Sequence, residues 1–231
     1  MSGPAATRAP STSVGDYVKA IWALAGAGAA STKDVADRLS ISSASVSAMF
    51  GRLQEMGLVR YRRYHGASLS EEGLAEALRL VRRHRLIETF LMEHLGYPWG
   101  DVHDEAERLE HAVSDGFTER LARFLGHPDR DPHGDPIPTA NGGLPAEDSF
   151  PLGDSAAGTR VEVARVVGHE DGAVLAYLEE RGLVPGRSLA VKEARALDGV
   201  VTVEDEGGVT HSLGPALAGS VFVRGSAGGG G

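Results

Sequence analysis

The stretch from Val102 to Ser114 constrains the fold and the chemistry of this chain more than any other stretch. Its sequence, VHDEAERLEHAVS, has no proline or glycine, and it places four potential metal ligands at helical spacings: His103, Glu107, Glu110 and His111. At about 100° per residue, these side chains project from roughly one third of the helix circumference. Two imidazoles and two carboxylates on one side of a helix offer nitrogen and oxygen donors to a divalent metal. The alternative is a solvated acidic face with two incidental histidines.

A second potential donor pair precedes this stretch. A helix is predicted from Ser70, its N-cap, to about Leu95, and within it His84 and Glu88 stand at positions i and i+4. The helix of the first stretch is predicted to continue to about Leu125. The middle of the chain is therefore predicted to form a hairpin of two long helices.

The net charge of −9 is unevenly distributed. Residues 1–80 carry nine Lys and Arg against seven Asp and Glu, a net of +2, and the remainder carries −11. An acidic body with a locally basic N-terminal part is compatible with phosphate binding by that part alone.

The basic part has the pattern of a winged helix-turn-helix. A helix is predicted over 16–24, a second one starts at Ser31 or Thr32, and a serine-rich third one ends at Gly57. Strands over 58–61 and 67–69 then form a wing. The predicted DNA-binding residues are the hydroxyl side chains at the start of the third helix and three arginines: Ser42, Ser43, Ser45, Ser47, Arg52, Arg62 and Arg63. Helix capping is the alternative role of each serine, and protein interaction is the alternative role of the winged fold.

The C-terminal part is predicted to be a small β-barrel. Short β-branched runs over 160–167, 188–193, 199–204 and 220–223 indicate strands, and the segment 127–148, rich in Pro, Gly and Asp, indicates a linker or an ordered loop. The predicted organisation is a disordered leader (1–12), a winged-helix domain (13–80), a dimerisation and metal-binding domain with linker (81–148), a barrel (149–225) and a flexible tail (226–231).

Composition narrows the class of protein. The chain has no cysteine, so disulfides and thiolate–metal bonds are not available to it. It has no apolar run of the ~20 residues that a membrane span needs, and no signal-peptide pattern. We therefore expect a soluble cytoplasmic protein that is mainly α-helical, with small β elements.

The order of these parts resembles a known family. A winged helix, the motif HDEAExxEH over 103–111 and the motif PHGxPIP over 132–138 are similar to the diphtheria-toxin-repressor family of metal-dependent transcription regulators. The C-terminal barrel resembles the SH3-like, FeoA-type domain of that family. The resemblance spans about residues 14–224. It implies a homodimeric repressor of metal homeostasis that reads a palindromic operator in double-stranded DNA, with neither a membrane nor a small organic molecule as partner.

The resemblance also implies two metal sites. The primary site matches Asp16, Glu107, Glu110 and His111, and the ancillary site matches His84, Glu88 and His103. The iron-sensing branch has Met and Cys where this chain has Asp16 and Glu107, and these carboxylates are typical of the manganese-sensing branch. Hard oxygen donors also suit Mn²⁺ on chemical grounds. The expected cofactor is therefore Mn²⁺ or Fe²⁺.

The chain departs from the family pattern at several positions. One barrel ligand of the ancillary site matches Val166, which cannot bind a metal, and the other falls near His169. Lys19 stands where a binuclear variant of the manganese branch has Glu, and the position of His133 is a ligand in some members.

Three alternatives remain open from the sequence. The first is an iron-dependent regulator of the same family. The second is a winged-helix regulator that senses an organic ligand, with structural histidines. The third is a metalloenzyme, but the chain lacks an HExxH motif and the paired Glu-x-x-His helices of di-iron bundles. We therefore expect a protein that is not an enzyme.

Overall fold

The computed structural model describes residues 14–25, 28–168, 172–195 and 197–225. The chain forms two compact units, residues 1–81 and residues 82–231. The predicted leader and tail lie outside the described residues, as does His169. No helix in the described part of the chain is long and apolar enough to cross a membrane.

The first unit begins with three helices around one apolar core: α1 (Val14–Ala25), α2 (Thr32–Arg38) and α3 (Ser43–Glu55). Ser31 is the N-cap of α2, because its side chain accepts a hydrogen bond from the backbone of Asp34 at 3.0 Å. Ile21, Phe50 and Leu53 have no exposed surface and lie at the centre of this core. The predicted helix-turn-helix is confirmed.

The wing is an antiparallel hairpin of β1 (Val59–Arg62) and β2 (Gly66–Leu69). Gly66 has a φ of +84°, and a Cβ there would lie 2.2 Å from the carbonyl oxygen of Ala30. Only glycine allows the hairpin to approach the chain before α2 so closely. The hairpin tip carries Tyr64, which is 88% exposed and also has a positive φ, +68°.

Helix α4 (Glu71–Leu95) begins in the first unit and continues into the second. Its N-cap is Ser70, whose hydroxyl oxygen accepts from the backbone of Gly73 at 3.0 Å. In the second unit, Leu86 and Leu91 of α4 pack with Val102 and Ala106 of α5 (Val102–Glu110). This packing places α5, which carries His103, Glu107 and Glu110, directly against α4.

The expected long helix from 102 to 125 is wrong. The chain leaves the helix after Glu110 and starts α6 (Asp115–Phe124). Ser114 is the N-cap of α6, because its hydroxyl oxygen accepts from the backbone of Phe117 at 3.2 Å. Arg83 of α4 donates to the carbonyl oxygen of Glu110 at 3.0 Å and binds Asp115 at 2.7 Å. These local bonds outweigh helix propagation, so the dimerisation region has three helices rather than a hairpin of two.

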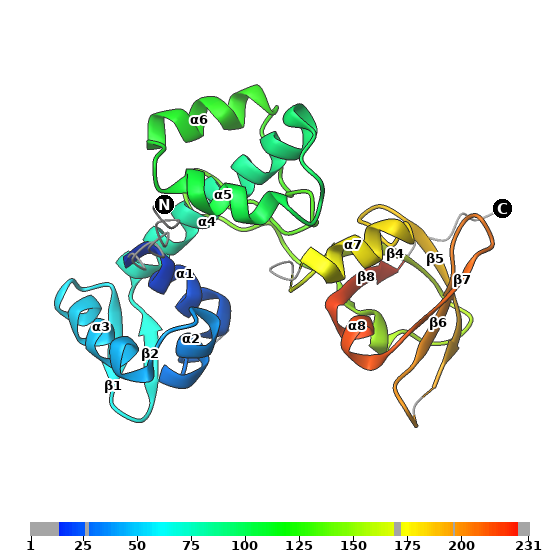
Figure 1. Cartoon of the computed structure of the whole chain (residues 1–231), viewed down its shortest axis with the longest axis horizontal. Coiled ribbons are helices and arrows are strands. Elements are labelled where there is room, and N and C mark those ends of the chain that lie inside the picture. The colour runs from blue at the N-terminus through cyan, green and yellow to red at the C-terminus, as the bar shows by residue number, and fades with distance from the viewer. Residues whose placement is uncertain (1–13, 26–27, 169–171, 196, 226–231) are drawn as a thin grey trace, which may run out of the picture. The chain divides into compact units, whose positions relative to one another are not determined.

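The C-terminal part contains one six-stranded antiparallel sheet in the order β3-β8-β4-β5-β6-β7, consistent with the predicted SH3-like fold. The strands are β3 (Phe150–Pro151), β4 (Arg160–Val166), β5 (Ser188–Ala194), β6 (Val201–Glu204), β7 (Thr210–Leu213) and β8 (Val221–Gly225). A short 3₁₀ helix, η1 (Leu152–Asp154), and helices α7 (Gly172–Glu180) and α8 (Pro215–Ser220) complete it (Figure 1). Leu175 and Leu178 of α7 are buried in the core of this sheet. Strands β3 and β7 were not predicted from the sequence.

We expect Ser114→Ala to destabilise the second unit, because the first turn of α6 loses its side-chain acceptor. The free energy of unfolding should fall by about 1 kcal/mol. Thermal and denaturant unfolding of the full chain measure the change, with Ser114→Asp as the control that keeps an N-cap oxygen. Equal stability of the alanine variant and the wild type would contradict the assignment of Ser114 as the cap.

Candidate metal centre

Helices α4 and α5 bring the three predicted ancillary ligands together. The Nε2 atom of His84 lies 2.9 Å from Oε1 of Glu88, and Nδ1 of His103 lies 3.1 Å from the same oxygen. The two imidazoles approach to 3.1 Å between these nitrogens. One donor atom from each residue therefore converges on a small volume that could hold a cation.

The charge of Glu88 is compensated by its neighbours. The side chain has no exposed surface, and burial alone would raise the pKa of its carboxyl. His84, the hydrogen bond from His103, and His133 outweigh this effect and hold the pKa of Glu88 well below its usual range. Glu88 therefore remains a buried anion among three imidazoles, which is a suitable arrangement for a divalent cation.

Three of the four predicted primary ligands lie together at the end of α5. His111 Nε2 is 3.8 Å from Oε1 of Glu110 and 4.0 Å from Oε1 of Glu107. Glu110 is fully buried, whereas the side chains of Glu107 and His111 are 39% and 40% exposed. These three residues thus present one buried and two accessible donors on the same side of α5.

The fourth predicted primary ligand, Asp16, belongs to the first compact unit. It lies in the first turn of α1 and is half-buried there. The α5 donors belong to the second compact unit. The joining of Asp16 to these donors therefore stays a prediction.

His84 contacts both donor groups of the second unit. While its Nε2 faces Glu88, its Nδ1 lies 2.7 Å from Oε2 of Glu110 and 3.5 Å from Oε2 of Glu107. If the proton is on Nδ1, it is donated to Glu110, and Nε2 keeps its lone pair for a cation. A carboxylate that orients a histidine ligand in this way is a common feature of metal sites.

A third donor group includes a residue that sequence reasoning missed. Glu88, Asp131 and His133 are all buried, with one donor atom of each within 4.8 Å of the others. His133 was noted only as a ligand position of some family members, and Asp131 was hidden in the segment interpreted as a linker. The Asp-Pro-His spacing, with two donors at i and i+2 just before a glycine, was the available signal.

Two oxygens of this third group lack hydrogen bonds. Within the described ranges, Oε2 of Glu88 and Oδ2 of Asp131 are buried and accept no hydrogen bond, although Oδ2 of Asp131 lies 3.4 Å from Nε of Arg85. Burial and the neighbouring Glu88 raise the pKa of Asp131 well above its usual range, and Arg85 opposes the shift. A divalent cation would compensate both oxygens, so these residues fit a metal.

The predicted DNA-binding residues lie on the surface of the first unit. Ser42 is the N-cap of α3, since its Oγ accepts from the backbone of Ser45 at 3.1 Å, and it also contacts Oγ of Ser45 at 2.8 Å. Ser47 is half-buried. The remaining predicted side chains are exposed: Ser43, Arg52, Arg62 and Arg63. Sequence reasoning missed Tyr64, whose exposed ring lies 5.1 Å from the guanidinium carbon of Arg63.

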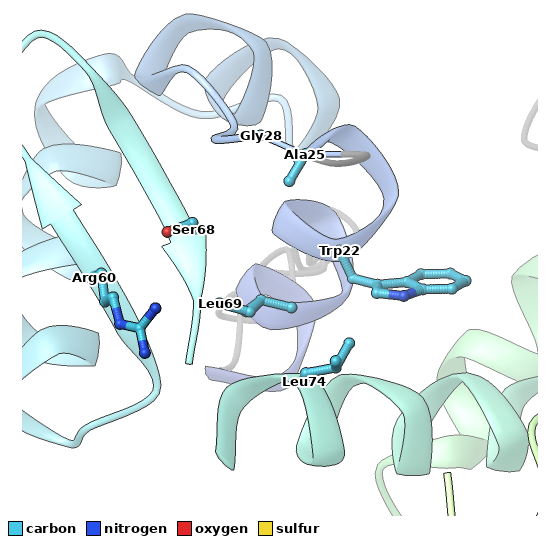
Figure 2. Close-up of a pocket in the computed structure, with 7 residues that line it drawn as sticks. All are labelled: Trp22, Ala25, Gly28, Arg60, Ser68, Leu69 and Leu74. Carbon is cyan, nitrogen blue, oxygen red and sulfur yellow. The ribbon is translucent and has the colours of Figure 1, made fainter. Parts of the chain in front are cut away.

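The first unit also contains a hollow of about 350 Å³ between α1, the wing and the start of α4 (Figure 2). Its lining residues are Trp22, Ala25, Gly28, Arg60, Ser68, Leu69 and Leu74. Arg60 is the one charged side chain in this lining, and no carboxylate or imidazole joins it. The hollow therefore does not form a further metal site.

Three models of known protein families match successive parts of the chain. The model of the iron dependent repressor N-terminal DNA binding domain matches residues 11–67. The model of the iron dependent repressor metal binding and dimerisation domain matches residues 70–139, and the FeoA domain matches residues 150–225.

Individual relatives are similar over most of their length. The iron-dependent repressor IdeR of Mycobacterium leprae is 30% identical over 190 residues, which cover 76% of this chain and 81% of the relative. A solved manganese-dependent transcriptional repressor in complex with manganese is 39% identical, with a TM-score of 0.85, over 91% of this chain and 99% of that one. The manganese regulator SloR is 35% identical, with a TM-score of 0.76, over 91% and 97%. This chain therefore belongs to the iron-dependent repressor family of metal-dependent, DNA-binding transcriptional regulators.

Proposed function

We propose that this protein is a transcriptional repressor that Mn²⁺ activates, with Fe²⁺ as the alternative metal. The observation that carries the proposal is the convergence of imidazoles and carboxylates between α4 and α5 around His84 and Glu88. All the donors are nitrogen or oxygen, and the chain has no cysteine that would favour more thiophilic ions. Similarity to solved manganese-dependent repressors supports the same metal.

The proposed primary site consists of Asp16 of α1 with Glu107, Glu110 and His111 at the end of α5. The bound cation supplies the positive charge that joins these carboxylates. Asp16 belongs to the first unit, the proposed DNA reading head, and the other three ligands belong to the second unit. A metal ion bound by all four therefore fixes the orientation of the reading head. Two reading heads must engage half-sites about one helical turn apart, ~34 Å. If the orientation of the DNA-binding unit varies, only a fraction of the dimers can bind both half-sites, and the apparent affinity for DNA falls by that fraction.

His84, Glu88 and His103 form the proposed ancillary site. With its proton on Nδ1, His84 donates to Glu110 and keeps the lone pair of Nε2 for the cation beside Glu88. Glu88 also presents its second oxygen to His133, at 3.9 Å from Nδ1, so we include Asp131 and His133 among the proposed ligands. Because Glu88 and His133 have no exposed surface, a substrate could not reach them, and we infer a regulatory rather than a catalytic role for the metal of the ancillary site.

We infer that the protein is a homodimer formed through an aromatic patch on α4 and α6. Phe124 is 64% exposed, and its ring lies 4.9 Å from that of His94 and 6.0 Å from that of Phe90. Phe117, two turns earlier on the same face of α6, is 46% exposed. Exposed aromatic side chains on one face suit a protein–protein interface. A two-fold axis through it would present two reading heads to a palindromic operator.

The first unit is proposed to bind this operator in the cytoplasm through α3 and the wing. Ser43, Ser45 and Ser47 reach phosphates or a thymine methyl, while Arg52 and the wing arginines bind phosphates. The start of α3 has no Arg, Asn or Gln for bidentate base contacts. Discrimination between sequences therefore depends on the shape of the DNA.

His111→Ala should abolish DNA binding at the Mn²⁺ concentration that suffices for the wild type, while the protein stays dimeric, because His111 is the one nitrogen donor of the proposed primary site. We expect the Mn²⁺ concentration needed for a gel shift to rise more than about tenfold. The DNA is a duplex selected from a random pool by wild-type protein in Mn²⁺, and His127→Asn, at an exposed position after α6, is the control. A variant that shifts this DNA at the wild-type Mn²⁺ concentration would show that His111 is not a ligand.

Substitutions at the ancillary site should weaken metal binding to an extent that depends on how many proposed ligands each residue contacts. His103→Ala removes one donor and should weaken one metal-binding event, with a milder effect on DNA binding than His111→Ala. His84→Ala should weaken both events, because His84 also contacts Glu110. Isothermal titration calorimetry with Mn²⁺ measures the number of metals per protomer. A single binding event that neither variant changes would contradict this assignment.

The pair Asp16→Met and Glu107→Cys should reverse the metal preference. Two hard, negatively charged donors become one thioether and one thiol, so activation by Mn²⁺ should be lost first. Activation by Co²⁺ and Ni²⁺ should be retained or increased, because a thiolate strengthens their binding. DNA binding is measured against free metal concentration for each ion in turn. An unchanged response to Mn²⁺ would mean that Asp16 and Glu107 do not bind the metal.

A further inference from the structure

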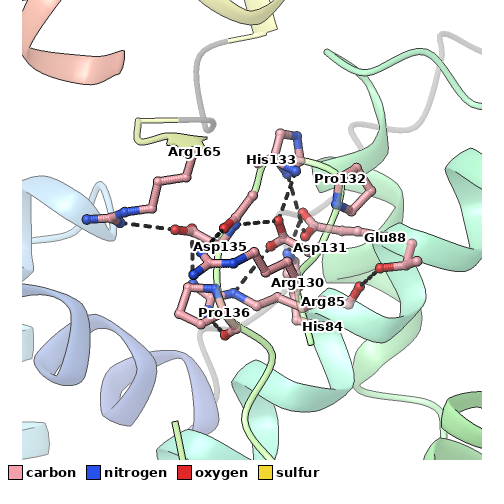
Figure 3. A network of polar contacts seen from close by, with 12 residues as sticks. His84, Arg85, Glu88, Arg130, Asp131, Pro132, His133, Asp135, Pro136 and Arg165 are labelled. Carbon is pink, nitrogen blue, oxygen red and sulfur yellow. Dashed lines mark hydrogen bonds and ion pairs between the residues drawn. The ribbon is translucent and has the colours of Figure 1, made fainter. Parts of the chain in front are cut away.

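A buried ion-pair chain joins the metal-bearing helix α4 to the C-terminal sheet. Asp135 is 4% exposed and lies between two arginines (Figure 3). Its Oδ2 lies 3.1 Å from Nη2 of Arg85, on α4, and its Oδ1 lies 3.1 Å from Nη1 of Arg165, on β4. A buried carboxylate that binds two guanidinium groups fixes the distance between the elements that carry them.

The backbone of the loop that carries Asp131 and His133 also contacts strand β4. The backbone of Val166, on β4, donates to the carbonyl oxygen of His133 at 2.9 Å. Gly134 follows with a φ of +85°, and a Cβ there would lie 2.1 Å from the carbonyl oxygen of Ala164. The loop backbone therefore lies directly on β4, with no space for a side chain at position 134.

The ring of His133 is held by a residue that belongs to the core of the C-terminal sheet. Trp99 stacks on this ring at 5.4 Å between centroids, and its indole nitrogen donates to the carbonyl oxygen of Pro132 at 3.1 Å. Trp99 is 2% exposed and packs in one apolar cluster with Leu152, Val163 and other core residues of that sheet. The position of the imidazole thus depends on how this sheet is packed.

We propose that the C-terminal domain positions the metal ligands Asp131 and His133, and that Arg165 is the positioning residue that holds the domain in place through Asp135. This inference rests on the proposed metal-dependent function. The domain contributes no ligand of its own at Val166, which is buried and apolar. The domain instead holds the loop that carries Asp131 and His133 in position against Glu88. By linkage, docking of the domain strengthens metal binding at Glu88, Asp131 and His133, and metal binding strengthens docking.

The test compares Arg165→Met with Arg224→Met in the full chain. Arg224 is a matched control, because it lies on the neighbouring strand β8 and pairs with Glu162 of the same sheet rather than with the loop. Mn²⁺ binding is measured by calorimetry, and amide exchange is measured on metal-free protein. Loss of a group that orients metal ligands costs about tenfold or more in metal affinity. We expect that loss for one binding event in Arg165→Met and no change in Arg224→Met.

The metal-free measurement separates positioning from general stability. In Arg165→Met the Val166 amide, which donates to His133, should exchange faster, while amides between β5 and β6 keep their wild-type protection. Arg165→Lys keeps the charge without the planar fork of donors, so it should bind Mn²⁺ more weakly than the wild type and more tightly than the methionine variant. If Arg165→Met does not fold, the lysine variant alone gives the decisive comparison with the wild type.

Several results would overturn the proposal. Wild-type Mn²⁺ affinity and stoichiometry in Arg165→Met, or in Arg165→Lys where the methionine variant does not fold, would remove the positioning role and leave the proposed function intact. An equal loss in Arg224→Met would assign the effect to general destabilisation of the sheet. A wild-type protein that binds no Mn²⁺ or Fe²⁺ would instead refute the proposed function, and the metal part of this inference with it.

Discussion

The burial of the Glu88 carboxylate is the constraint on which the second unit depends. A charge with no exposed surface is costly unless positive or hydrogen-bonding groups surround it. His84 comes from one turn earlier on α4, His103 from α5 and His133 from the loop after α6, and all three lie around this one carboxylate. A buried carboxylate with several imidazoles around it suits a bound divalent cation.

Much of this arrangement follows from local sequence. The i, i+4 spacing of His84 and Glu88 and the dense donors of 103–111 predict two groups of donors, each on one side of its own helix. Their joining in one site is implied only by the family resemblance, because helix geometry does not say which helices pack together. The break between α5 and α6 does not follow from periodicity, because it depends on the side chain of Ser114 and on Arg83, a distant residue of α4. Asp131 lies in a segment without regular structure, so only the three-dimensional contacts reveal it as a donor.

The C-terminal domain shows a related limit of sequence reasoning. The pattern of β-branched runs predicts strands β4, β5, β6 and β8, but the pattern carries no information on what the sheet contacts. In the structure, Arg165 of β4 and the indole of Trp99 connect the sheet to the loop of His133. The absence of a ligand at Val166 does not disconnect the domain from the metal centre. Backbone and ion-pair contacts connect it instead.

In the proposed function, one cation joins Asp16 of the DNA-binding unit to the donors of α5. The most direct measurement is anomalous diffraction at the manganese absorption edge from crystals of Mn²⁺-loaded full-length protein. We expect a peak bonded to carboxylate oxygens of Asp16, Glu107 and Glu110 and to the imidazole of His111, at about 2.0–2.3 Å. Manganese peaks confined to the second unit, with Asp16 bonded to none of them, would contradict the proposed link between metal binding and the orientation of the reading head.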